Sequence, residues 1–72
     1  MTKHRFTVVI EKDEEGMLIA SVPSIKGCHT QAKNIPTLLE RIKEAIELCL
    51  ETEKGRIGSM EFVGLQEIEV MA

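Results

Sequence analysis

Aromatic side chains are scarce in this sequence, which has no Trp, no Tyr and only two Phe, Phe6 and Phe62. Single-stranded nucleic acids are usually held by stacking bases on several exposed rings, so this kind of binding is disfavoured. Positive charge is also limited, because 9 Lys and Arg are set against 12 Asp and Glu, a net charge of −3. A duplex-binding protein carries a basic face. We therefore expect no direct binding of nucleic acid.

Cysteines and long apolar runs are few as well. Cys28 and Cys49 are too few for the disulfide framework of a small secreted domain. No apolar run approaches the length of a membrane-spanning helix. The stretch Met1–Arg5 is not followed by the apolar segment of a signal peptide. We therefore expect a cytoplasmic protein with no membrane association. The 72 residues, 43% hydrophobic and 29% charged, fit one globular domain over residues 1–72.

Alternating apolar residues predict three strands in the first half of the chain. In the first of them, Phe6, Val8 and Ile10 fall on one side. The strands are expected at about residues 4–12, 17–22 and 28–33.

Turn residues between these segments indicate an antiparallel meander. The acidic run 13–15 leads into Gly16, which tolerates the positive φ that a hairpin turn requires. Pro23 and Gly27 bracket the second turn.

A change of period at position 34 predicts one helix over about residues 35–53. Asn34 is a good N-cap, and Pro36 falls in the first turn, where its missing N–H costs little. Apolar residues at spacings of three and four then cover one broad helix face. They are Ile35, Leu38, Leu39, Ile42, Ala45, Ile46, Cys49 and Leu50.

The residues after the helix, about 60–71, have an irregular strand pattern. Val63 and Leu65 share one parity, whereas Ile68 and Val70 have the other, which suggests a bulge or bend near residues 64–67. The predicted order is thus strand, strand, strand, helix, strand. The predicted fold class is α+β in two layers, β-β-β-α-β, with one helix packed on an antiparallel meander.

Between positions 14 and 31 the sequence reads Glu-Glu-Gly, then Ile-Ala-Ser-Val-Pro, then Gly-Cys-His-Thr-Gln. This order resembles the HicB family, the antitoxin half of HicAB toxin–antitoxin pairs, and residues 42–48 are similar to the family's helix. The residues of this structural motif are Gly16, Pro23, Gly27, Cys28, Thr30, Asn34 and Ala45. The chain departs from the pattern at Ala32, where the family usually has Gly, and at Asn34, where it often has Thr.

The resemblance implies a degenerate ribonuclease H-like fold, oligomerisation, and a partner, a small basic HicA-type mRNA-cleaving toxin. Many family members carry a DNA-binding module after this domain, but the residues after the helix here read as a strand. We expect a toxin-binding domain without that module. The open edges of a small sheet favour self-association on physical grounds as well. We therefore predict a homodimer or a higher even-numbered oligomer.

Two groups of acidic residues are candidates for contacts with such a partner. Four glutamates repeat on the side of the helix opposite its apolar face, and three carboxylates occupy the first hairpin turn. A solvated, solubilising face explains the same pattern without a partner. The candidate residues are Glu40, Glu44, Glu47 and Glu51 on the helix and Asp13, Glu14 and Glu15 in the turn.

Two alternatives to an antitoxin-like function remain. A stand-alone oligomeric module with another partner would need no toxin. A small metal-dependent nuclease on the same fold would rely on Glu11 and Asp13, yet two-metal chemistry needs several converging carboxylates. Cys28 and His29 are adjacent, so they point to opposite faces of a strand and do not readily share one zinc ion. We therefore expect no enzymatic activity, no metal and no cofactor.

Overall fold

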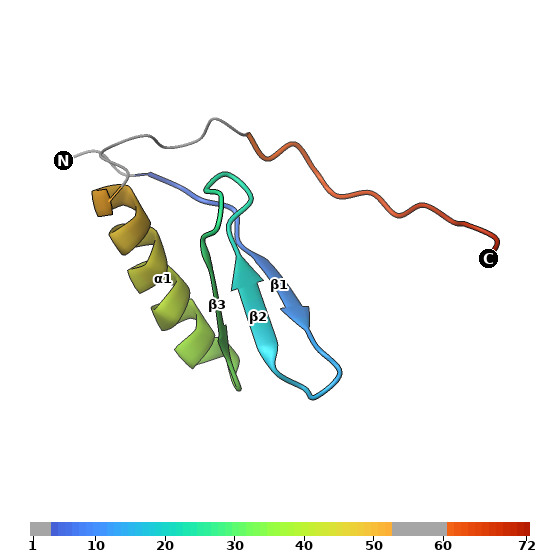
Figure 1. The fold of residues 1–72 in the computed structure, drawn as a ribbon, viewed down its shortest axis with the longest axis horizontal. Coiled ribbons are helices and arrows are strands. Elements are labelled where there is room, and N and C mark those ends of the chain that lie inside the picture. Colours follow the sequence, from blue (N-terminus) through green and yellow to red (C-terminus); the bar gives the residue numbers. More distant parts are fainter. Residues whose placement is uncertain (1–3, 53–60) are drawn as a thin grey trace.

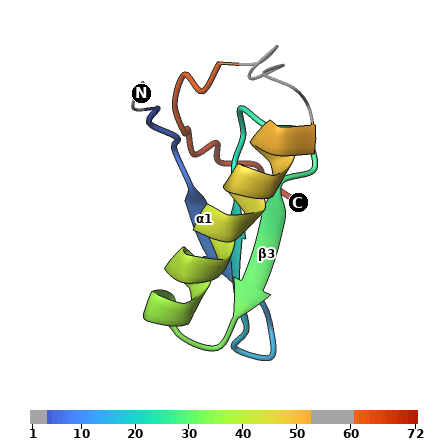
Figure 2. The same cartoon turned by 90° about the vertical axis from the view of Figure 1, so that its left-hand side faces the viewer.

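A three-stranded antiparallel sheet and one long helix form two layers (Figure 1). The computed structural model describes residues 4–52 and 61–72. Its elements are β1 Val9–Lys12, β2 Leu18–Ser21, β3 His29–Ala32 and α1 Ile35–Thr52. The sheet order is β1-β2-β3, and α1 lies across one face of the sheet (Figure 2). The α+β class and the antiparallel meander are confirmed, while each strand is shorter than the sequence pattern suggests.

The two connections between strands turn at glycines, as predicted. Gly16 has φ 86° and Gly27 has φ 80°, a region where side chains are strained. In the first turn, Oδ1 of Asp13 accepts hydrogen bonds from the N–H groups of Glu15 and Met17, both at 2.9 Å. The Asp13 carboxylate therefore helps to close the hairpin.

The helix begins where its cap was predicted. Asn34 Oδ1 accepts a hydrogen bond from the N–H of Thr37 at 2.9 Å, so one of the unpaired donors of the first turn is satisfied. At the exposed edge of the contact with β3, Arg41 Nη1 donates to the carbonyl oxygen of Gln31 at 2.9 Å. The predicted helix end at Glu53 lies outside the described residues.

The core between the two layers is small and aliphatic. The helix contributes Leu38 and Ile42 to the core, and both are buried. Ile35 and Leu39, which belong to the same predicted apolar face, are exposed. Ala45, Ile46, Cys49 and Leu50 are partly buried against the core. The buried residues are Ala20, Val22, Ile25, Cys28, Ala32, Leu38 and Ile42.

The strand predicted over residues 60–71 is not formed. Met60 lies outside the described residues, and residues 61–72 belong to no strand. This C-terminal segment runs away from the sheet and the helix (Figure 1). A strand needs a neighbour for its backbone hydrogen bonds, and the segment has none beside it here. The order over the described residues is therefore β-β-β-α, and these residues contain no helix long and apolar enough to cross a bilayer.

Candidate protein-docking surfaces

The outer side of α1 carries an acidic face, defined here as Glu40, Glu44, Glu47 and Glu51. All four side chains are exposed, as their position opposite Leu38 and Ile42 predicted. Leu48 lies among them, four residues after Glu44 and three before Glu51, and is 62% exposed. The face therefore combines four negative charges with one exposed apolar side chain.

The acidic hairpin turn differs from the acidic face. Asp13 lies at the tip of the β1–β2 hairpin, and its carboxylate is occupied by the two backbone N–H groups described above. Glu14 and Glu15 are exposed. The sequence therefore identified three acidic positions correctly as surface residues, but Asp13 has a structural role in the turn.

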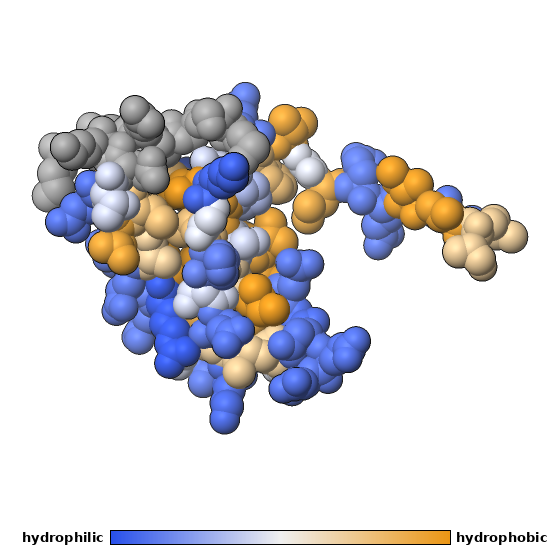
Figure 3. All heavy atoms as spheres, viewed as in Figure 1, coloured by the Kyte–Doolittle hydropathy of each residue, from blue (hydrophilic) through white to orange (hydrophobic). Residues whose placement is uncertain are grey.

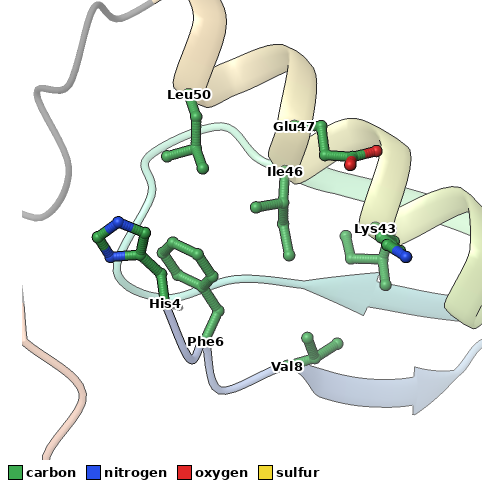
Figure 4. Close-up of a pocket in the computed structure, with 8 residues that line it drawn as sticks. His4, Phe6, Val8, Lys43, Ile46, Glu47 and Leu50 are labelled. Atoms are coloured by element: carbon green, nitrogen blue, oxygen red, sulfur yellow. The ribbon is translucent and has the colours of Figure 1, made fainter. Parts of the chain in front are cut away.

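An apolar groove separates α1 from the segment that leads into β1. It has a volume of about 400 Å³. Its apolar walls are Phe6 and Val8 on one side and Ile46 and Leu50 on the other, and these side chains face one another in Figure 4. Ile42 forms part of the lining, and His4, Lys43 and Glu47 add polar groups.

Sequence reasoning missed this groove because it placed Phe6 and Val8 on one side of a strand, and that pattern does not tell how fully the helix covers them. Both are only partly buried. Ile35 and Leu39, which the sequence also placed on the apolar face of the helix, are likewise exposed.

The cysteines form part of the packing between sheet and helix. Cys28 is 3% exposed and Cys49 is partly buried. Burial, together with the neighbouring Cys49 thiol, raises the pKa of the Cys28 thiol to about 11. A thiol that keeps its proton is a poor nucleophile, so Cys28 is a packing residue at neutral pH.

The other motif residues have structural positions too. Pro23 is in the turn after β2, Thr30 is partly buried on β3, and Ala45 is partly buried on α1. Across residues 4–52 and 61–72, no three His, Cys, Asp or Glu side chains converge to hold a metal ion. Glu11 and Asp13 are both exposed.

Known proteins that are similar to this chain share one family name. No family model matches the chain. A UPF0150 protein of Archaeoglobus fulgidus is 54% identical over 66 residues, 92% of this chain and 94% of that protein. One from Synechocystis sp. is 44% identical over 70 residues, 97% of this chain and 100% of that protein. One from Thermoplasma acidophilum is 38% identical over 68 residues, 94% of this chain and 99% of that protein.

Proposed function

The chain belongs to the UPF0150 family, and from this premise we propose that it is a protein-interaction module, an antitoxin-like inhibitor of a small HicA-type mRNA-cleaving toxin. The HicB resemblance of residues 14–31 motivates this choice of partner. Its turn glycines, Gly16 and Gly27, adopt the positive φ values that the pattern requires.

The acidic face of α1 is the observation that carries the proposal. A protein that cleaves RNA is cationic where it holds the phosphate backbone. A surface of four exposed glutamates would attract that region and speed the encounter. Leu48, 62% exposed within the face, would lose water-accessible apolar surface on docking. Inhibition follows from occlusion, because a folded domain seated there excludes RNA without performing any chemistry.

Charge reversal on the acidic face tests the proposal. A basic reading frame of roughly 60–80 residues next to this gene, a size typical of a small single domain, would be expressed alone and together with this chain. Growth arrest by the toxin alone should be relieved by the wild-type chain. Glu44→Lys with Glu51→Lys should abolish the relief, since it replaces two negative charges in the face with positive ones.

The hairpin provides a matched control for this experiment. Glu14→Lys with Glu15→Lys changes the net charge by the same amount on another exposed surface and should leave the relief intact. If only the Glu14→Lys/Glu15→Lys chain fails to relieve the arrest, the toxin binds at the hairpin turn and not at the acidic face. Continued arrest despite abundant folded wild-type chain would contradict the proposed partner.

A stand-alone oligomeric module is the second candidate function, favoured by the exposed apolar residues of the C-terminal segment. The absence of any neighbouring basic reading frame would support it. In that case the acidic face would be a solubilising surface, and reversing its charges would leave the partner interactions of the chain unchanged.

A further inference from the structure

The C-terminal segment, residues 61–72, exposes an unusual amount of apolar surface for a chain of this size. Five of its side chains are between 74% and 95% exposed. Hydrophobic groups, interleaved with hydrophilic ones, lie along the extended segment in Figure 3. Such surface is typically covered in the functional state of a protein. The exposed residues are Val63, Leu65, Ile68, Val70 and Met71.

An apolar groove beside a free strand edge lies on the folded part of the molecule. The helix packs on β3 and β2, and the apolar groove runs along the side of the core nearest β1, between Val8 and Ile46. β1 pairs with β2 along one side, so its other side is an edge of the sheet. A strand added at this edge would complete the sheet, and its inward side chains would enter the groove.

Charge favours the C-terminal segment as that strand. Residues 61–72 contain three glutamates and no Lys or Arg. Arg5 precedes β1, Lys12 ends it and Lys43 lines the groove. Two acidic residues lie in the same region, Glu11 in β1 and Glu47 in the groove lining. The segment and the groove are therefore complementary in hydrophobicity, and basic residues at the edge and groove outnumber acidic ones by one, which favours an acidic segment.

We propose that two copies of this chain exchange their C-terminal segments. Residues 61–72 of each copy add as a fourth strand to the β1 edge of the other and place their apolar side chains in its groove. A bulge between Leu65 and Ile68 would allow both apolar pairs to face the groove despite their different parity. Because each copy gives one segment and accepts one, the exchange closes as a two-fold symmetric dimer.

Substitutions in the exposed segment test the exchange without altering the core. In the full chain, Val63→Asp with Leu65→Asp should convert a dimer into a monomer, seen as a halved mass by sedimentation equilibrium at tens of micromolar. The matched control, Gln66→Asp with Ala72→Asp, adds the same two charges to the segment outside the apolar pairs and should remain a dimer. A monomeric wild-type chain, or a dimeric Val63→Asp/Leu65→Asp variant, would overturn the proposal.

A mixing experiment separates exchange from a segment that folds back on its own chain. Val8→Asp blocks the groove but leaves the segment intact, whereas the Val63→Asp/Leu65→Asp chain has an intact groove. Each should be monomeric alone, and together they should form a one-to-one complex through the one remaining exchange site. Absence of this complex would contradict the exchange.

Folding of the Val8→Asp chain is checked by its helical circular dichroism signal. If the Val8→Asp chain loses that signal, Lys43→Glu, a substitution at an exposed position of the groove, is used in its place. This substitution reverses the charge that faces the acidic segment and should give the same mixed complex with the Val63→Asp/Leu65→Asp chain. A folded Lys43→Glu chain that forms no such complex would also overturn the exchange.

Discussion

At the residue scale, folding changes the ionisation of Cys28. Its thiol is 3% exposed, and burial together with the Cys49 thiol raises its pKa from 9.0 to about 11. As the pH rises, the unfolded chain therefore loses this proton before the folded chain does. Two pKa units at roughly 1.4 kcal/mol each amount to about 3 kcal/mol of stability in total. About 2 kcal/mol of the free energy of unfolding should be lost between pH 9 and pH 11, and the remainder outside this range.

Urea unfolding at several pH values measures this loss. Cys28→Ala serves as the control, because it lacks the thiol whose ionisation is being measured. The variant should be less stable than wild type at pH 8, and the difference should shrink as the pH approaches 11. Parallel pH profiles for the two proteins would show that burial of the thiol is not coupled to folding.

For single residues, the sequence predicts backbone conformation and exposure better than it predicts hydrogen bonds. Gly16 and Gly27 were predicted as turn residues because positive φ is a local requirement, and both adopt it. The exposure of Glu44 and Glu51 followed from helix periodicity alone. The hydrogen bonds of Asp13 were not predicted, because an acidic turn residue can either face solvent or bond its own backbone.

At the scale of elements, α1 depends on its first turn. Asn34 satisfies the N–H of Thr37, and replacing such a cap with alanine typically costs about 1 kcal/mol. Asn34→Ala should therefore lower the thermal midpoint by about 4–8 °C in a domain of this size. Asn34→Ser should keep most of the stability, because its hydroxyl can accept the same bond. Equal losses in both variants, measured by circular dichroism, would show that another interaction of Asn34 is responsible.

The strands show why local pattern overestimates paired structure. Phe6 and Val8 continue the alternation of β1, but the ladder stops at Val9 opposite Ser21. Continuing the register would place Pro23 opposite Thr7, and proline has no N–H to donate. The alternation identifies an extended chain, whereas pairing depends on the neighbouring strand. The same reasoning applies to Val63 and Leu65, whose pattern indicates a strand that one copy of the chain leaves without a neighbour.

At the scale of the whole molecule, exchange of C-terminal segments should make stability depend on protein concentration. If folding and association are coupled, a hundredfold increase in concentration favours the folded dimer by roughly 3 kcal/mol through mass action. The thermal midpoint of the wild-type chain should then rise by several degrees over that range. The midpoint of the Val63→Asp/Leu65→Asp chain should be lower and independent of concentration, because its groove stays open. Calorimetry of both chains at matched concentrations measures the effect. A wild-type midpoint that is independent of concentration would mean that the helix and three strands fold as a monomer, without the second copy covering the groove between α1 and Val8.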